Sequence, residues 1–310
     1  MVRIPLLALW LAALSLLASR LWADQPDKPK SAEAPATNAP EAEESKFIRL
    51  RRDSQDRPSA METAVVTYTS QKRPGISIDL IGAVHIADRS YYDDLNKLFE
   101  KYDVVLYELV APEGTRIPKG GRKEKSTHPI GVMQDGMSSI LELSHQLACV
   151  DYTKPNLVHA DMSPDEFSKT MEDRGESFFQ MFMRLMGTGI AQSAAGASGM
   201  NDTDLLMALF SKDRALKLKT LMAQQFQSLE GSMAALDGPG GSTIITERNK
   251  RCFDVLDKQL AAGKKRIAVF YGAGHLADMQ KRLATDYGFQ RTSETWLAAW
   301  NLKPPKDLEK

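Results

Sequence analysis

The chain has 310 residues, and its 40 Lys and Arg residues balance its 40 Asp and Glu residues, so the formal net charge is zero. A balanced charge argues against a nucleic-acid binder, because phosphate recognition generally needs a basic face. The part of the chain that follows residue 46 is long enough for one large domain with its own hydrophobic core.

The first 23 residues are predicted to be a secretory signal peptide. A basic start at Arg3 is followed by an apolar run over residues 4–17, and we expect cleavage after Ala23. A membrane anchor is the competing interpretation, but the apolar run is shorter than the roughly 20 residues that a spanning helix needs. No later segment is apolar enough to cross a bilayer. We therefore expect a periplasmic or secreted protein with no stable transmembrane segment after signal cleavage.

Residues 24–46 are predicted to be a disordered linker. They are rich in Pro, Ala, Glu and Lys and contain almost no large apolar side chains, so burial cannot offset the entropy lost on ordering. The folded domain is then expected to occupy residues 47–310.

The folded part alternates strands and helices. Residues 47–70 are predicted to form two strands that can pair as a hairpin. A strand at 76–82, a helix at 88–101 and a strand at 103–110 are joined by short links, which indicates a parallel strand, helix and strand unit. The further elements expected are a helix at 132–148, a strand at 156–161, a helix start at 163–166, a helix at 242–262, a strand at 266–271, a helix at 276–286 and a strand at 290–299. This pattern predicts an α/β fold with a mostly parallel central sheet and flanking helices.

A helical insertion is expected over about residues 163–235. Nine of the 14 methionines fall between Met162 and Met233. They are interpreted either as core filling within the insertion or as an adaptable apolar wall over a site, since the Met side chain fits varied ligands. In the second interpretation the insertion forms a lid.

Two cysteines are present, Cys149 and Cys252. An exported protein with an even number of cysteines can pair them. Two buried free thiols are the other interpretation, and the sequence leaves both open.

Two apolar strands each end in a Gly-x-x-His turn, at residues 82–85 and 272–275. In an open parallel sheet, ligands bind outside the carboxyl ends of the strands, which is where both His85 and His275 are expected. Gly82 and Gly272 let the backbone bend tightly or approach a ligand closely. One such histidine begins a helix as often as it binds a ligand, whereas two in matched positions favour a shared site.

Other strands and helices supply charged residues near the same edge. Glu108 interrupts an apolar strand, where an unpaired carboxylate is costly to bury, and pairing with an arginine is its structural interpretation. Asp161 follows the third parallel strand and is equally able to cap the next helix. Glu247 and Arg248 begin the helix at 242–262, either on a solvated face or within reach of the site, where Arg248 can bind a substrate oxygen or anchor Glu108 bidentately.

Two neutral imidazoles and one carboxylate form the ligand set of a catalytic divalent-metal site that keeps one position open for water. We therefore predict His85, His275 and Glu108 as metal ligands, with Glu247 or Asp161 as the base that takes the proton of that water. Manganese, cobalt and zinc all suit mixed nitrogen and oxygen ligands. Residues 272–277 also fit a loose dinucleotide-binding pattern, but too few residues follow to complete such a site.

Four segments together resemble the TraB/PrgY/GumN family, to which the Tiki metalloproteases are related. They read Ile-Gly-Ala-Val-His-Ile-Ala-Asp at 81–88, Leu-Tyr-Glu-Leu at 106–109, Thr-Glu-Arg-Asn at 246–249 and Phe-Tyr-Gly-Ala-Gly-His at 270–275. The likeness covers most of the chain after about Met61. It implies a metal-dependent peptidase that uses manganese or cobalt, with His85, His275 and Glu108 as the site. It also implies a role for the pair Glu247 and Arg248.

These observations favour an exported metal-dependent hydrolase that cuts a peptide or a related acyl bond in a peptide or small-molecule substrate. The alternative is a non-catalytic binding protein that captures haem, metal or a peptide, as the distantly similar haem-binding ChaN proteins suggest. A purely structural envelope protein is the third possibility, and in that case His85 and His275 would not affect metal content.

Overall fold

The computed structural model describes residues 47–121, 138–177, 207–208, 210–211, 213–237 and 240–304. The signal peptide and linker predicted for residues 1–46 lie outside this part, as does much of the predicted insertion. Residues Ser45–Lys310 cluster as a single unit. None of the helices in the described part has both the length and the hydrophobicity needed to span a bilayer.

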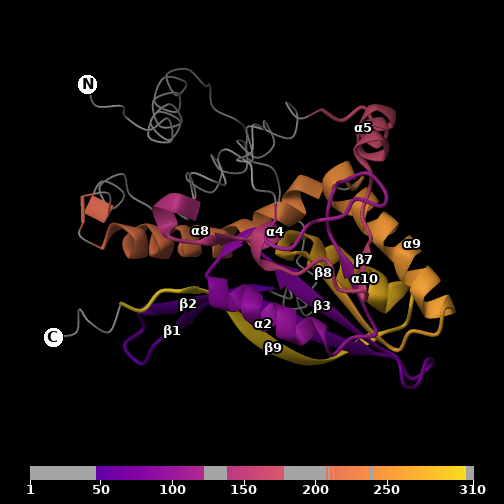
Figure 1. The fold of residues 1–310 in the computed structure, drawn as a ribbon, viewed down its shortest axis with the longest axis horizontal. Helices are drawn as coiled ribbons and strands as arrows, with labels where there is room; N and C mark the ends of the chain where they lie inside the picture. Colours follow the sequence, from indigo (N-terminus) through magenta and orange to yellow (C-terminus); the bar gives the residue numbers. More distant parts are fainter. Residues whose placement is uncertain are drawn as a thin grey trace, which may run out of the picture. The chain divides into compact units, whose positions relative to one another are not determined.

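A mixed sheet forms the centre of the domain (Figure 1). Its strands run in the order β1, β2, β3, β8, β5 and β7, and β9 pairs with β2 in addition. The four strands β3, β8, β5 and β7 are parallel, whereas β1, β2 and β9 join by antiparallel pairing. The strands are β1 (Ile48–Arg52), β2 (Pro58–Thr69), β3 (Ser77–Ala83), β5 (Val104–Tyr107), β7 (Leu157–His159), β8 (Arg266–Gly272) and β9 (Gln290–Asn301).

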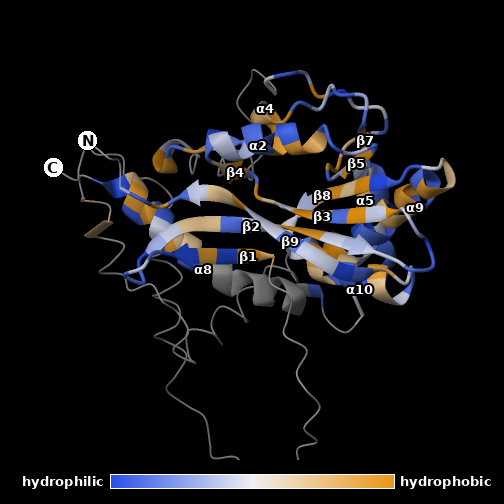
Figure 2. Cartoon of the chain, turned by 90° about the horizontal axis from the view of Figure 1, so that it is seen from below, coloured by the Kyte–Doolittle hydropathy of each residue, from blue (hydrophilic) through white to orange (hydrophobic). Residues whose placement is uncertain are grey.

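Helices cover both faces of this sheet. Figure 2 shows α2 and α4 on one side and α10 on the other. The ring of Phe99 in α2 packs edge-on against Phe270 of β8, with the ring centroids 5.0 Å apart. The helices are α2 (Arg89–Phe99), α4 (Gln146–Cys149), α5 (Pro164–Asp173), α8 (Arg214–Asp237), α9 (Arg248–Ala261) and α10 (Leu276–Thr285).

The predicted α/β fold with a central sheet and flanking helices is confirmed, and the sheet is mixed, with parallel pairing among β3, β8, β5 and β7. The hairpin of β1 and β2 forms as expected. Helix α5 begins at the predicted position, with Pro164 first and a capping box between Ser163 and Glu166. Strands β3 and β5 are parallel but not neighbours, because β8 lies between them.

The helix predicted at residues 132–148 is wrong in its second half, where it is interrupted. Residues 132–137 lie outside the described part, and the helix expected to continue to residue 148 ends near Leu141. Glu142 has a positive φ of 56°, in the left-handed region that L-residues rarely adopt and that breaks a helix. The short strand β6 (Ser144–His145) follows and pairs with β4 (Ile86–Ala87), directly after the first Gly-x-x-His turn. Helical spacing alone did not reveal this pairing.

The helix predicted at 242–262 begins with a π-helical turn, η1 (Thr243–Glu247), before it continues as α9. Single π turns inside helices are frequent at functional sites. Gly241 precedes this turn with a φ of +71°, and a Cβ atom there would lie 2.5 Å from Oγ1 of Thr246. The wide turn sets the orientation of the residues that follow it, Arg248 and Asn249.

The two cysteines are free and buried. Cys149 ends α4, which packs with α2, whereas Cys252 lies on α9, whose Asn249 binds Asp278 of α10 on the other face of the sheet (Figure 2). The sheet therefore separates the two sulfur atoms, and burial raises the pKa of the Cys252 thiol.

We expect the protein purified without reductant to show two thiols per chain after unfolding in denaturant, by titration with a thiol reagent. Cys252 should not react in the folded protein, because its thiol is buried and protonated. A non-reducing mass that is two hydrogens lighter than the reduced mass would contradict the free-thiol assignment.

Candidate metal and catalytic site

Four parallel strands end at the same edge of the sheet and carry the predicted site residues there. Register places Ala83 beside Gly272, Tyr107 beside Phe270 and Tyr107 beside His159. The site residues follow these strand ends by one to three positions, and they are His85 after β3, Glu108 after β5, Asp161 after β7 and His275 after β8.

The sequence had suggested that Glu108 interrupts a strand. In the structure it is instead the first residue beyond β5. Its side chain is 11% exposed. Oε1 accepts a hydrogen bond of 2.7 Å from Nη2 of Arg248, and Oε2 accepts one of 2.6 Å from the backbone N–H of Gly272. Burial would raise the pKa of Glu108, but the nearby His275, Arg248 and His85 together with this N–H hold it well below its usual range. Glu108 is therefore ionised.

Arg248 joins Glu108 to Asp161. Its Nε and Nη2 atoms donate to the two carboxylate oxygens of Asp161 over 2.9 and 2.6 Å. The bidentate partner is thus Asp161, whereas the sequence had suggested Glu108. Asp161 does not cap α5, since Ser163 takes that role. Its side chain is fully buried, and this ion pair is what allows an acid there.

The hydrogen bonds of Asn249 fix the tautomer of His275. The amide nitrogen of Asn249 donates to a carboxylate oxygen of Asp278 over 2.8 Å and to the carbonyl of His275 over 3.1 Å. The amide oxygen is therefore the acceptor for Nδ1–H of His275, 2.7 Å away. Nε2 keeps its lone pair and faces Nη1 of Arg248 at 3.4 Å. Burial lowers the pKa of His275 to about 4, so this imidazole is neutral at pH 7.

His85 is held in the same way by a different amide. Its Nδ1 lies 3.2 Å from Oε1 of Gln146, whose own nitrogen donates to the hydroxyl of Tyr152 over 2.8 Å. Nδ1 therefore carries the hydrogen in the neutral ring and Nε2 keeps its lone pair. Tyr91 and Tyr92 of α2 fix the turn, since their hydroxyls donate to the carbonyls of residues 82 and 84. The imidazole itself is exposed.

The two turn glycines meet close packing, and neither has a positive φ. A Cβ atom on Gly272 would lie 3.1 Å from Oε2 of Glu108, which occupies that space to reach the N–H. A Cβ atom on Gly82 would lie 3.4 Å from the carbonyl of Ala64. Gly272 thus allows a carboxylate to approach the backbone, whereas Gly82 allows a neighbouring strand to do so.

Glu247 is not brought together with these residues. Its Oε1 accepts from Nη1 of Arg174 over 3.1 Å and from Nζ of Lys250 over 2.9 Å. Arg174 also binds the carbonyls of residues 240 and 241 and so ties α5 to the start of η1. The carboxylate that lies beside His275 is Glu108.

The donor atoms at this edge suit a divalent cation, although the side chains do not enclose one as they stand. Two ligands of one tetrahedral ion, each at about 2.1 Å, are roughly 3.4 Å apart, and Nε2 of His275 lies 3.6 Å from Oε1 of Glu108. Within the described residues, no group of three or more His, Cys, Asp or Glu side chains is arranged to hold a metal ion. Arg248 contacts both of these donor atoms, and His85 is the third predicted donor, whose Nε2 makes no hydrogen bond to the residues that the structure describes.

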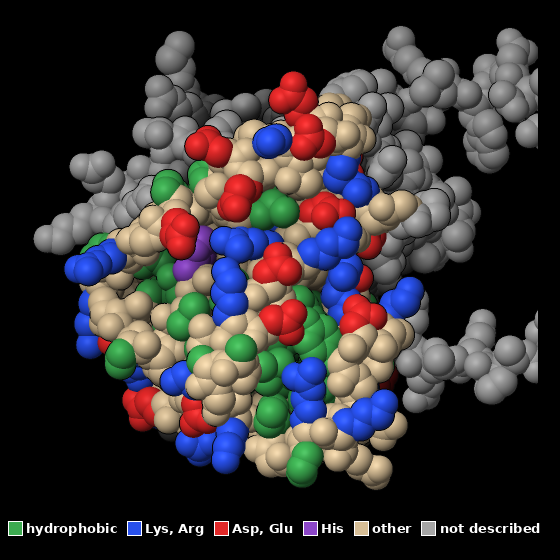
Figure 3. All heavy atoms as spheres, turned by 90° about the vertical axis from the view of Figure 1, so that its right-hand side faces the viewer, with side chains coloured by type: hydrophobic (Ala, Val, Ile, Leu, Met, Phe, Trp, Pro, Cys, Tyr) green, Lys and Arg blue, Asp and Glu red, His purple; other side chains and the backbone are tan. Residues whose placement is uncertain are grey.

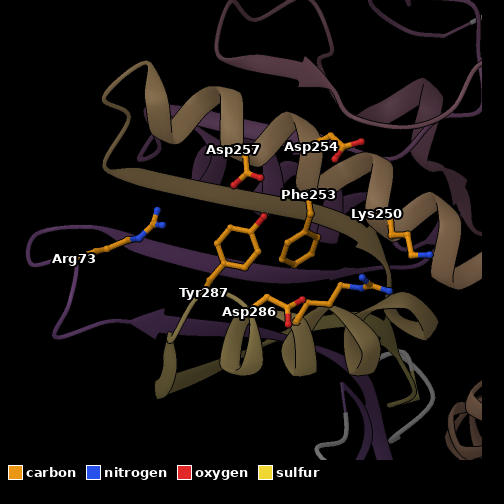
Figure 4. A pocket seen from close by; sticks show the side chains of 8 residues that line it. Arg73, Lys250, Phe253, Asp254, Asp257, Asp286 and Tyr287 are labelled. Carbon is orange, nitrogen blue, oxygen red and sulfur yellow. The ribbon is translucent and has the colours of Figure 1, made fainter.

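A groove lies between α9 and α10 (Figure 4). The rings of Phe253 and Tyr287 lie 5.3 Å apart within it. Acidic and basic side chains intermingle around them, as they do over the coloured part of the surface in Figure 3. The groove contains none of the predicted site residues.

Sequence reasoning missed the residues that orient the histidines. Asn249 was quoted only as part of a motif, and nothing distinguished Gln146 or Tyr152. Gln146 reaches His85 because β4 pairs with β6, a contact between segments about 60 residues apart that carries no local signal.

Comparisons with family models, curated proteins and solved structures found no match to this chain. The fold and the site therefore define a class, an α/β protein with paired histidines and acids at the carboxyl edge of its parallel strands.

Replacing Arg248 should destabilise the protein strongly. Arg248→Met leaves Glu108 and Asp161 as buried acids without a cation, which typically costs about 3–5 kcal/mol. Urea unfolding at pH 7 measures this loss, and the double variant Arg248→Met/Asp161→Asn should recover part of it. A loss below about 1 kcal/mol, the size expected for an exposed pair, would contradict the burial of this cluster.

Acidification should destabilise the metal-free protein. The unfolded chain protonates His275 near pH 6.5 and the folded one only near pH 4, so the unfolded state binds more protons between these values and stability falls as the pH drops. The expected loss is about 3 kcal/mol at pH 4. The depressed pKa of Glu108 adds a further loss below its usual range. Urea unfolding with a chelator from pH 7 to pH 4 measures the slope, and an unchanged slope in His275→Gln would rule out this cause.

Proposed function

We propose that the chain is an exported metal-dependent hydrolase of the TraB/PrgY/GumN type that cleaves a peptide or a related acyl bond. His85, His275 and Glu108 hold the divalent ion, which is manganese, cobalt or zinc. The observation that carries the proposal is that both Gly-x-x-His imidazoles follow neighbouring strands and both have Nδ1 bound by a side-chain amide, which leaves Nε2 as a metal ligand.

The amides correspond to the outer partners that metal-binding histidines need. Such a histidine almost always donates its second N–H to an oxygen atom, which fixes the ring and its tautomer. Asn249 and Gln146 supply that oxygen to His275 and His85. A histidine that only begins a helix does not need an oxygen partner on Nδ1. Here both histidines of the proposed site have one.

Each residue of the proposed site then has a chemical role. A bound divalent ion supplies a water of lowered pKa and polarises a carbonyl group. Glu108 is kept ionised by its surroundings. Its Oε1, beside Nε2 of His275, would bind the ion, and its Oε2 would accept the proton of the attacking water and return it to the leaving nitrogen. Arg248 and the N–H of Gly272 hold the Glu108 carboxylate in place. Asp161 in turn fixes Arg248.

Capture without turnover is the second candidate function, and a specific contact favours it. Nη1 of Arg248 lies 3.4 Å from Nε2 of His275, so the guanidinium already contacts a proposed metal ligand. If Arg248 keeps this position, its N–H occupies the lone pair of His275 that an ion would need, so the site would bind a peptide without activating a water. A measurement of peptide cleavage therefore distinguishes hydrolysis from capture without turnover.

The purified chain should contain one equivalent of Mn, Co or Zn by elemental mass spectrometry and should hydrolyse members of a mixed peptide library, with activity lost in a chelator. His85→Ala and His275→Ala should lose both metal and activity. His145→Gln is the control, because Nε2 of His145 is already bound by Oγ of Ser138 at 2.8 Å. Uncleaved peptides at full metal occupancy would favour capture, and unchanged metal content in both alanine variants would refute the site.

A further inference from the structure

We propose that Tyr152 is a catalytic residue of this site and donates a hydrogen bond from its phenol to the carbonyl oxygen of the bond that is cleaved. The inference rests on the proposed hydrolase function and adds the group that stabilises the negative charge developing on that oxygen. No sequence motif marks Tyr152, which follows α4 in a short loop before β7.

Tyr152 lies beside Gln146, which holds His85, and beside Tyr107, which precedes Glu108. Through Gln146 it connects to His85, since the amide oxygen of Gln146 binds Nδ1 of His85 and the amide nitrogen donates to the Tyr152 hydroxyl. Its ring packs edge-on against Tyr107, with centroids 4.9 Å apart, and Tyr107 directly precedes Glu108. The phenol is thus held from both sides, next to one histidine turn and one strand end.

The hydrogen-bond pattern leaves the phenol proton unused. Gln146 must present its oxygen to the N–H of His85 and therefore presents its N–H to Tyr152, so the hydroxyl oxygen acts as an acceptor. Among the hydrogen bonds of the described residues, none is donated by the Tyr152 hydroxyl. Tyr107 is equally buried and makes no hydrogen bond among the described residues, so Tyr152 is distinguished by the amide of Gln146, which fixes its oxygen and also holds His85. Tyr152 is 8% exposed, and a substrate carbonyl oxygen at this edge is the acceptor that fits.

The phenol is also kept protonated. Burial raises the pKa of Tyr152 well above its usual value, and the charge of Glu108 acts in the same direction. A neutral phenol that is buried and held in place in advance is the kind of donor that stabilises an oxyanion at low cost.

During the chemical step, negative charge develops on the carbonyl oxygen of the bond that is cleaved, and this is the atom to which Tyr152 donates. Water oxygen bonds to the carbonyl carbon, its proton passes to Glu108, and the π electron pair of the C=O bond moves onto the carbonyl oxygen. The Tyr152 hydrogen bond strengthens as that charge grows. When the C=O bond re-forms, the C–N bond breaks, its electron pair leaves with nitrogen, and nitrogen receives the proton from Glu108. Tyr152 keeps its proton throughout.

The test compares Tyr152→Phe with Tyr107→Phe in the metal-loaded full chain, on a peptide that the wild type cleaves. Tyr152→Phe should lower kcat about 100-fold, the usual effect of removing one oxyanion donor, while KM and metal content stay within twofold. Tyr107→Phe keeps the same ring packing and loses a hydroxyl that makes no hydrogen bond among the described residues, so its kcat should match the wild type.

The outcomes distinguish the inference from the function it rests on. Wild-type cleavage with an unchanged kcat in Tyr152→Phe would overturn the inference and leave the hydrolase standing, and so would a loss of metal in that variant, which would make Tyr152 a support for His85. A wild-type protein that cleaves no peptide would refute both the role of Tyr152 and the hydrolase function. If Tyr152→Phe does not fold, difluorotyrosine at position 152 replaces it. Its more acidic phenol should shift the alkaline limb of the kcat profile to lower pH, and an unshifted limb would overturn the inference.

Discussion

The ion pair of one guanidinium with two buried carboxylates fixes the geometry of this site. Glu108 and Asp161 follow different strands, and each is too buried to remain charged alone. Arg248 binds both, so the ends of β5 and β7 and the start of α9 are held at fixed positions relative to one another. The π-helical turn before Arg248 and the left-handed Gly241 are local irregularities that this contact offsets.

The two histidine turns reach similar chemistry by different routes. In both, an apolar strand ends at a Gly-x-x-His turn and a side-chain amide binds Nδ1 of the histidine. Asn249 comes from α9 and is itself fixed by Asp278 of α10. Gln146 begins α4 and is brought close by the pairing of β4 with β6. One imidazole is buried and the other exposed, so His275 forms the rigid half of the site and His85 the accessible half.

Local sequence signals were enough for the elements and for the strand-end residues. The apolar runs, the capping Ser163 and the two turns can be recognised from residues that are close together in the sequence. Glu108 and Asp161 can be placed at the site because the carboxyl ends of parallel strands meet at one edge of a sheet. Three features depended on distant contacts instead. The chain leaves the predicted helix near Glu142 because β6 pairs with β4, and β8 lies between β3 and β5. Glu247, one of the two acids predicted as the base, binds Arg174 and Lys250 and does not reach the site.

Charge decides what kind of ligand this edge of the sheet can take. Two carboxylates and one guanidinium leave one negative charge, because the imidazole of His275 is neutral at pH 7. An added anion, such as a haem propionate, would meet that charge in a site with little water to screen it. A cation would instead compensate it and find lone pairs on His275 and His85. The guanidinium of Arg248 already contacts Glu108 and His275 as a cation would, which is consistent with the proposed metal ion and not with an anionic cofactor.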